Sequence, residues 1–171
     1  MAFTHRRKLM TGAAALLAGA AGAVWWRRRD RRPADDPKLR PYDEQADVRA
    51  ELARAQQTAA AQGKQVLVVF GANWCPDCRI LERTVLLGGP LATHLAAGYV
   101  KVKVNVGQFD RHMDLNEELG RPARAGIPSL AITDAQGKVL RVVDARHLAR
   151  AQHRGEDSVI EAIEQGGVSE T

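Results

Sequence analysis

Two cysteines, Cys75 and Cys78, are the residues of this chain whose type and spacing best suit chemistry, and they form a C-x-x-C pair. A structural zinc site needs four ligands, and the sequence has no second cysteine pair to complete one. A structural disulfide is a poor interpretation too, because a four-residue loop limits its entropic stabilisation to about 2 kcal/mol. Two inert buried thiols remain an alternative. The spacing favours a redox pair, which needs no metal.

The position of the pair supports the redox interpretation. A continuous apolar run, Gln65–Phe70, predicts a buried strand, and a helical stretch follows from Trp74 to about Leu87. Cys75 therefore lies at or near a helix N-terminus, where free backbone N–H groups and the helix dipole favour an anion. Thiols in such places can have pKa values of about 3.5–7.5. We expect Cys75 to be the nucleophile and Cys78, one turn further on, to be the less exposed, resolving thiol.

The two residues between the cysteines act in different ways. Pro76 suits a first helical turn, where its missing N–H costs nothing. Asp77 favours the helix start, but its carboxylate opposes ionisation of the neighbouring thiol. We therefore expect a modest depression of the Cys75 pKa, to a value above about 5.

The elements that must position these residues follow from hydrophobic periodicity and turn signals. The sequence predicts an α/β fold in which a central mixed β-sheet is flanked by α-helices. The predicted helices span about 43–62, 74–87, 91–97, 111–119 and 156–165. The predicted strands span 65–70, 99–105, 129–133 and 138–143, the last two as a hairpin.

The motif Trp74-Cys75-Pro76-Asp77-Cys78 after an apolar strand, together with Gly126-Ile127-Pro128 before another strand, resembles the thioredoxin family over roughly residues 43–165. The resemblance implies a thioredoxin fold and dithiol–disulfide exchange. It also implies a cis peptide bond before Pro128, in a loop beside the cysteines that pairs with a substrate's backbone. By the same resemblance, Trp74 is a flanking surface aromatic and Ile127-Pro128 the substrate platform, with Pro76 and Asp77 beside it. An ordinary trans proline and a core tryptophan are the alternatives.

Two features depart from the family pattern. Many thioredoxins carry a buried acid six residues before the first cysteine, and here that position is Val69. The connection 106–125 is also longer than in small thioredoxins. Its stretch 109–114 could form a rim near Pro128 that selects partners, although a solvated loop and helix is the simpler interpretation.

The charge of the chain is divided unevenly. The formal net charge is +5, but residues 1–40 contain 10 basic and 3 acidic residues, whereas the remainder is mildly acidic. This division excludes a basic nucleic-acid-binding domain and predicts no nucleic-acid partner. We expect an N-terminal signal or membrane-anchor segment at 1–32, a proline-containing linker at 33–42 and a thioredoxin-like domain at 43–171.

The N-terminal segment resembles a twin-arginine export signal, because Arg6-Arg7 precede an uncharged stretch, residues 9–26, rich in glycine and alanine. That stretch is at the lower length limit for crossing a bilayer, and its apolar residues contribute only about −2 kcal/mol to insertion. Trp25, Trp26 and the arginines after them resemble a membrane-interface belt instead. We expect a cell-envelope or periplasmic protein, exported or tethered through residues 9–26. A cytoplasmic-facing anchor stays open.

These observations lead to one expected function. The protein is expected to be a thiol–disulfide oxidoreductase, a dithiol reductant or isomerase, without an organic cofactor or a metal. Its expected partners are proteins bearing disulfides or thiols, and an upstream electron donor that regenerates the dithiol, membrane-bound if the domain is exported. A thiol oxidant and a non-catalytic adaptor or chaperone module are the alternatives.

Overall fold

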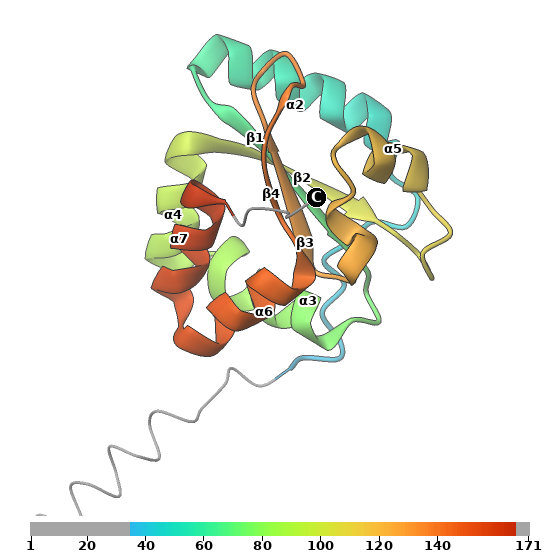
Figure 1. The fold of residues 1–171 in the computed structure, drawn as a ribbon, viewed down its shortest axis with the longest axis vertical. Coiled ribbons are helices and arrows are strands. Elements are labelled where there is room, and N and C mark those ends of the chain that lie inside the picture. The colour runs from blue at the N-terminus through green and yellow to red at the C-terminus, as the bar shows by residue number, and fades with distance from the viewer. Residues whose placement is uncertain (1–34, 167–171) are drawn as a thin grey trace, which may run out of the picture. The chain divides into compact units, whose positions relative to one another are not determined.

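The computed structural model describes residues 35–166. In chain order, its elements are α2 (Val48–Gln62), β1 (Gln65–Gly71), α3 (Pro76–Leu81), the π-helical turn η1 (Glu82–Leu86), α4 (Gly89–Gly98), β2 (Tyr99–Asn105), α5 (Met113–Glu118), the 3-10 turn η2 (Pro122–Ala125), β3 (Ser129–Thr133), β4 (Val139–Val143), α6 (Ala145–Arg154) and α7 (Glu156–Gln165). Figure 1 shows the strands crossing the middle of the domain between two groups of helices.

The four strands form one mixed sheet in the order β2-β1-β3-β4. Strand β1 is central, parallel to β2 and antiparallel to β3, and β3 and β4 form an antiparallel hairpin. The predicted α/β class with a central mixed sheet flanked by helices is therefore confirmed. Because β1 is hydrogen-bonded on both sides, its carboxyl end is held firmly, and the C-x-x-C pair follows directly from that end.

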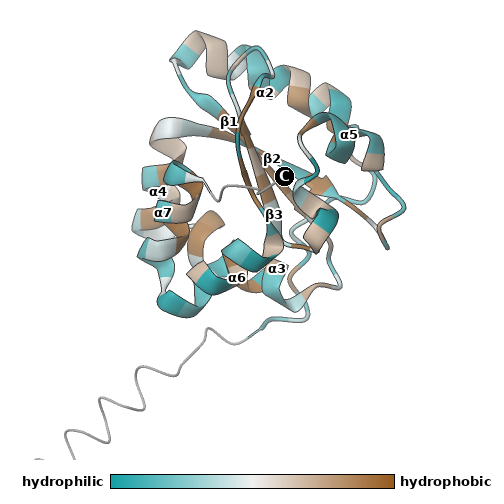
Figure 2. Ribbon diagram, in the orientation of Figure 1, coloured by the Kyte–Doolittle hydropathy of each residue, from teal (hydrophilic) through white to brown (hydrophobic). Residues whose placement is uncertain are grey.

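The alternation of side chains along β1 divides the core into two layers. Leu67 and Val69 face one side and pack with the cysteines and with apolar residues of α3, α4, α6 and α7. Val66, Val68 and Phe70 face the other side and pack with α2 and α5. Figure 2 shows the hydrophobic strands enclosed between helices whose outer surfaces are mostly hydrophilic. The cysteines thus belong to the core layer beneath α6 and α7.

Several helix boundaries differ from the predicted ones. Helix α2 begins at Val48, not at Asp43, because the Asp47 side chain caps it by accepting a hydrogen bond from the Ala50 N–H at 3.0 Å. The helix predicted over 74–87 is divided into α3 and η1. Helix α6, which the sequence did not predict, buries only Leu148 and Ala151, so its apolar stripe is too narrow to stand out among its basic residues.

The compact domain begins at Asp35, within the stretch that the sequence assigns to a linker. Tyr42 lies in the core, and Asp35 forms an ion pair with the buried Arg79 of α3. Residues 35–42 therefore pack against the domain. The expected signal or anchor segment, including the tether at 9–26, lies outside the described residues. Within 35–166, each helix is too short or too polar to cross a bilayer.

Candidate functional site

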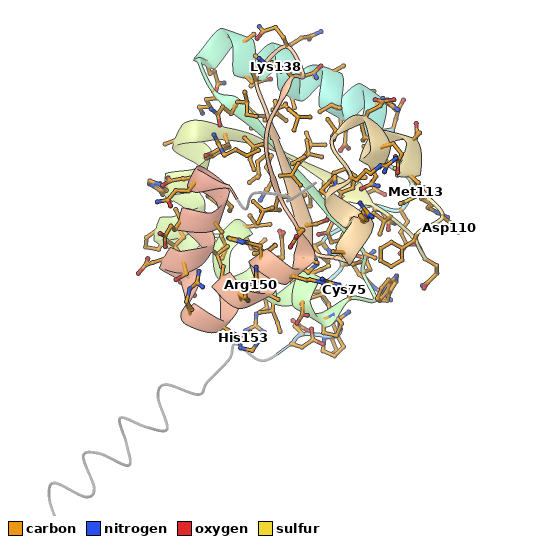
Figure 3. The ribbon with its side chains drawn as sticks, in the orientation of Figure 1. Cys75, Asp110, Met113, Lys138, Arg150 and His153 are labelled. Atoms are coloured by element: carbon orange, nitrogen blue, oxygen red, sulfur yellow. The ribbon has the colours of Figure 1, made fainter. Side chains whose placement is uncertain are left out.

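The two cysteines occupy the junction between β1 and α3. Strand β1 ends at Gly71, and Cys75 adopts an extended conformation as the N-cap of α3. Its Sγ accepts a hydrogen bond from the Cys78 backbone N–H at 3.3 Å, in the place where a serine or aspartate oxygen caps other helices. Pro76 is the first helical residue, as expected from its fixed φ. Figure 3 labels Cys75 at this end of α3.

Both cysteines are free thiols. The side chain of Cys78 is more deeply buried than that of Cys75, with 1% against 4% of each residue exposed. The order of exposure matches the prediction, although Cys75 is itself far from open to solvent. A substrate disulfide must therefore contact the exposed residues around Cys75, which are Trp74, Pro76 and Asp77, to reach the sulfur.

The surroundings of Cys75 lower the pKa of its thiol. The largest cause is the hydrogen bond that the Cys78 thiol donates to the Cys75 sulfur, and the backbone N–H groups of Cys78 and Asp77 add to it. Burial and the negative charge of Asp77 oppose this effect. The direction of the shift and the opposing influence of Asp77 agree with the sequence-based expectation.

The surroundings of Cys78 act in the opposite direction. Burial raises the pKa of its thiol strongly, and so do the hydrogen bond to Cys75 and the charge of the Cys75 thiolate. The Tyr42 hydroxyl lowers the Cys78 pKa, because it donates a hydrogen bond to the sulfur. At neutral pH the pair therefore consists of one activated sulfur and one that keeps its proton.

A loop from the other end of the sequence meets the cysteines. The Cys75 thiol donates to the carbonyl oxygen of Ile127, with an Sγ···O distance of 3.7 Å, across a separation of 52 residues. The Ile127–Pro128 peptide bond is cis, as the resemblance implied. Ile127 is half-buried, and Pro128 is buried immediately before β3. The fold thus brings both predicted loop residues to the cysteine pair.

An aromatic ledge, Trp74 and Phe109, flanks the pair. The Trp74 side chain is exposed, with 45% of the residue accessible, which excludes the core alternative. Its indole N–H donates to the Gly107 carbonyl at 2.7 Å, and its ring meets the exposed Phe109 ring edge-on at 6.2 Å between centroids. A groove of about 230 Å³ borders the ledge and is lined by Trp74, Asp110 and Arg111 among others.

The remaining predicted residues lie at the surface of the same site. Pro76 and Asp77 are both exposed, and the Asp77 carbonyl accepts a hydrogen bond from Gln152 of α6 at 3.4 Å. The stretch 106–112 after β2 carries Phe109 to Trp74, so part of the long connection borders the tryptophan that precedes Cys75. Among residues 35–166, no three His, Cys, Asp or Glu side chains gather as metal ligands.

Sequence reasoning missed a polar group beneath the cysteines. The position of the family's buried acid is held by the fully buried, apolar Val69. A different acid, Glu82 of η1, is buried nearby and is paired with Lys103 of β2 at 2.6 Å. Glu82 stands four residues after Cys78, so helical spacing alone would have placed the two on one face. Tyr42 carried no comparable signal, because it stands among prolines and charged residues that are typical of a linker.

Comparison with known proteins identifies relatives of this arrangement. A family model described as thioredoxin-like matches residues 47–135. The crystal structure of a disulphide isomerase from Xylella fastidiosa Temecula1 is similar at 32% sequence identity and a TM-score of 0.68, covering 75% of this chain and 97% of that one. The oxidised C-terminal domain of DsbD from Neisseria meningitidis shares the fold at 20% identity and a TM-score of 0.50, over 71% of this chain and 97% of that one. No curated protein sequence matches the chain significantly.

Proposed function

The chain belongs to the thioredoxin-like family, and on this premise we propose that it is a thiol–disulfide oxidoreductase that reduces or isomerises disulfide bonds in proteins through Cys75 and Cys78. The observation that carries the proposal is the asymmetry of the pair, in which the Cys75 sulfur caps α3 with a lowered pKa while Cys78 is buried with a raised one. The 32% identity with a protein described as a disulphide isomerase supports it.

The proposed reaction has two exchange steps. The Cys75 thiolate attacks one sulfur of a substrate disulfide, forming a mixed disulfide and releasing the other substrate sulfur as a thiolate that takes up a proton. Cys78 then loses its proton and attacks the Cys75 sulfur, which forms the Cys75–Cys78 disulfide and releases the second substrate thiol. The substrate gains two electrons and the protein loses two. A dithiol donor must return them before the next cycle.

The surface around Cys75 is the proposed substrate site. The Ile127 carbonyl, 3.7 Å from the Cys75 sulfur, and Pro128 would receive the substrate backbone on one side. Exposed Trp74, Pro76 and Asp77 would contact it on the other. Neither a metal nor an organic cofactor enters the exchange, since both electrons travel with the sulfur atoms.

We further place the protein in the cell envelope, exported by the segment at 1–32 or tethered through residues 9–26. The support is the arrangement of paired arginines, a Gly/Ala-rich stretch and a second arginine cluster in the sequence. An envelope location would separate the domain from cytosolic reductants. Its electron donor would then be a membrane-bound dithiol system.

A trapping experiment tests the proposal. In Cys78→Ser the second step cannot occur, so mixed disulfides between Cys75 and substrate proteins should accumulate in intact cells. They should appear as bands on non-reducing gels that dithiothreitol removes. The matched control is Cys75→Ser with Cys78 intact, which should trap nothing.

The other outcomes separate the alternatives. If neither variant forms a mixed disulfide and Cys75→Ser leaves the function of the protein in the cell intact, the proposal is contradicted. That result would favour an adaptor or chaperone module. A high reduction potential of the Cys75–Cys78 couple, measured against glutathione, would favour a thiol oxidant.

A further inference from the structure

Tyr42 lies in the same core layer as the cysteine pair, although it lies outside the motif and precedes α2. Only 3% of the residue is exposed, and it packs in the same core layer as Cys75 and Cys78. Asn73, two residues before Cys75, clamps its backbone from both sides. The Tyr42 N–H donates to the Asn73 side-chain oxygen at 3.0 Å, and the Asn73 amide donates to the Tyr42 carbonyl at 2.8 Å.

The ring of Tyr42 fits against the last residue of β1. A Cβ atom placed on Gly71 would lie 2.1 Å from the Tyr42 hydroxyl oxygen and 2.3 Å from the ring carbon that bears it. Every residue other than glycine would therefore displace the hydroxyl. The backbone clamp and this close approach fix the position of the hydroxyl in the core layer that contains Cys78, where it can donate a hydrogen bond to the Cys78 thiolate and lower its pKa.

Burial and the negative charge of Cys75 oppose ionisation of Cys78, so a neutral hydrogen-bond donor near its sulfur would help to stabilise the thiolate. The ionisable groups whose charges act on Cys78 or on Tyr42 are Cys75 at the N-cap of α3, Arg79 on α3 and Glu82 on η1, which is paired with Lys103 on β2. Burial and the neighbouring negative charges raise the pKa of Tyr42 well above its ordinary range, so the phenol keeps its proton and stays a donor. A neutral donor stabilises a thiolate without itself needing to titrate.

Building on the proposed function, we propose that Tyr42 is a catalytic hydrogen-bond donor to Cys78, which stabilises the thiolate that attacks the Cys75 sulfur in the second exchange step. Cys78 first releases its proton to solvent. The S–S bond between Cys75 and the substrate then breaks as the Cys75–Cys78 bond forms, and the departing substrate thiolate takes up a proton from solvent. The hydroxyl of Tyr42 keeps its own proton throughout. The residue that stabilises the resolving thiolate thus comes from the segment before α2. The position on β1 where many thioredoxins carry a buried acid is occupied by the apolar Val69.

The test follows the two steps separately, in the reduced full chain treated with dithiobis(nitrobenzoate). Attack by Cys75 releases one thionitrobenzoate, and attack by Cys78 on the resulting mixed disulfide releases the second, so stopped-flow absorbance gives two phases. In Tyr42→Phe, the pH midpoint of the second phase should rise by about one unit or more, and release below it should slow about tenfold. The first phase should change less than about twofold.

The matched control is Tyr99→Phe, since the hydroxyl of Tyr99 lies 3.4 Å from Arg141 in a different part of the domain. It should leave both phases unchanged. Gly71→Ala, which retains the Tyr42 hydroxyl but displaces it, should slow the second phase as Tyr42→Phe does. Thermal melting checks that each variant is folded.

The outcomes separate this inference from the proposed function. A second phase in Tyr42→Phe with an unmoved midpoint would overturn the role of Tyr42, whether its rate is unchanged or uniformly lower at every pH. If the unmodified protein showed no second phase at all, the proposed function would fail and the inference with it.

Discussion

The carboxylate of Asp77 lies in the first turn of α3, exposed to solvent and two residues after Cys75. Its charge raises the pKa of the Cys75 thiol against the hydrogen bonds that lower it. Asp77→Asn should therefore lower the pKa of Cys75 further, by about half a unit through a largely solvated charge. The measurement is the pH dependence of Cys75 alkylation by iodoacetamide.

A second carboxylate provides the control for this prediction. Asp157 occupies the same place in the first turn of α7 and is also exposed. Asp157→Asn should leave the alkylation midpoint unchanged. A rise of the midpoint in Asp77→Asn would show that the carboxylate acts mainly through the start of α3, not through its charge.

The stretch between β2 and α5 contains a residue, Phe109, whose backbone conformation is energetically unfavourable. Phe109 has a left-handed φ of 64°, a conformation that costs a residue with a side chain roughly 1–2 kcal/mol. The side chain that this backbone carries is not buried but lies exposed against Trp74. We expect an exposed aromatic ring that is held at some energetic cost against Trp74, the neighbour of Cys75, to contact protein substrates.

Phe109→Ala tests this element. Loss of an aromatic contact of about 1 kcal/mol should reduce kcat/KM for a disulfide-bonded protein about fivefold. The rate with dithiobis(nitrobenzoate), which is too small to need the ledge, should be unaffected. Leu140→Ala on β4, another exposed large apolar residue, is the matched control and should change neither rate. Equal losses with the protein and the small disulfide would contradict a role in docking.

The stability of the whole reduced molecule should depend on pH because of its buried acids. Burial raises the pKa of Cys78 and of Tyr42, so the folded protein keeps protons that the unfolded chain releases above about pH 8.5 and pH 10. The unfolded state then binds fewer protons, and the free energy of unfolding falls as the pH rises. For Cys78 the limiting slope is about 1.4 kcal/mol per pH unit.

Urea unfolding of the reduced protein between about pH 7 and pH 10 measures this slope. Cys78→Ser is the comparison, because serine does not titrate in this pH range. Its decline with pH should be shallower above about pH 9. Parallel curves for the two proteins would mean that the Cys78 thiol ionises in the folded state as readily as in the unfolded chain.

Local sequence signals account for much of this molecule, and contacts distant in sequence account for the rest. The position of Cys75 and Cys78 at a strand–helix junction was predictable, because the sequence signals for the buried strand, the turn and the helix start all lie within about fifteen residues. The Ile127 loop was expected only by family resemblance, since its contact with Cys75 spans 52 residues. Tyr42 was missed, because nothing in a run of prolines and charges indicates a buried aromatic. The narrow apolar stripe of α6 was missed for a similar reason.

The packing of residues 35–42 has a practical consequence for anyone who produces this domain alone. A recombinant fragment begun at Asp43, the boundary that composition suggests, would retain both cysteines and every helix and strand found within residues 35–166. It would nevertheless lack the phenol beside Cys78 and the carboxylate paired with Arg79. Such a fragment could fold, react at Cys75 and still give misleading kinetics for the second step. Starting the fragment before Asp35 keeps the reactive centre whole.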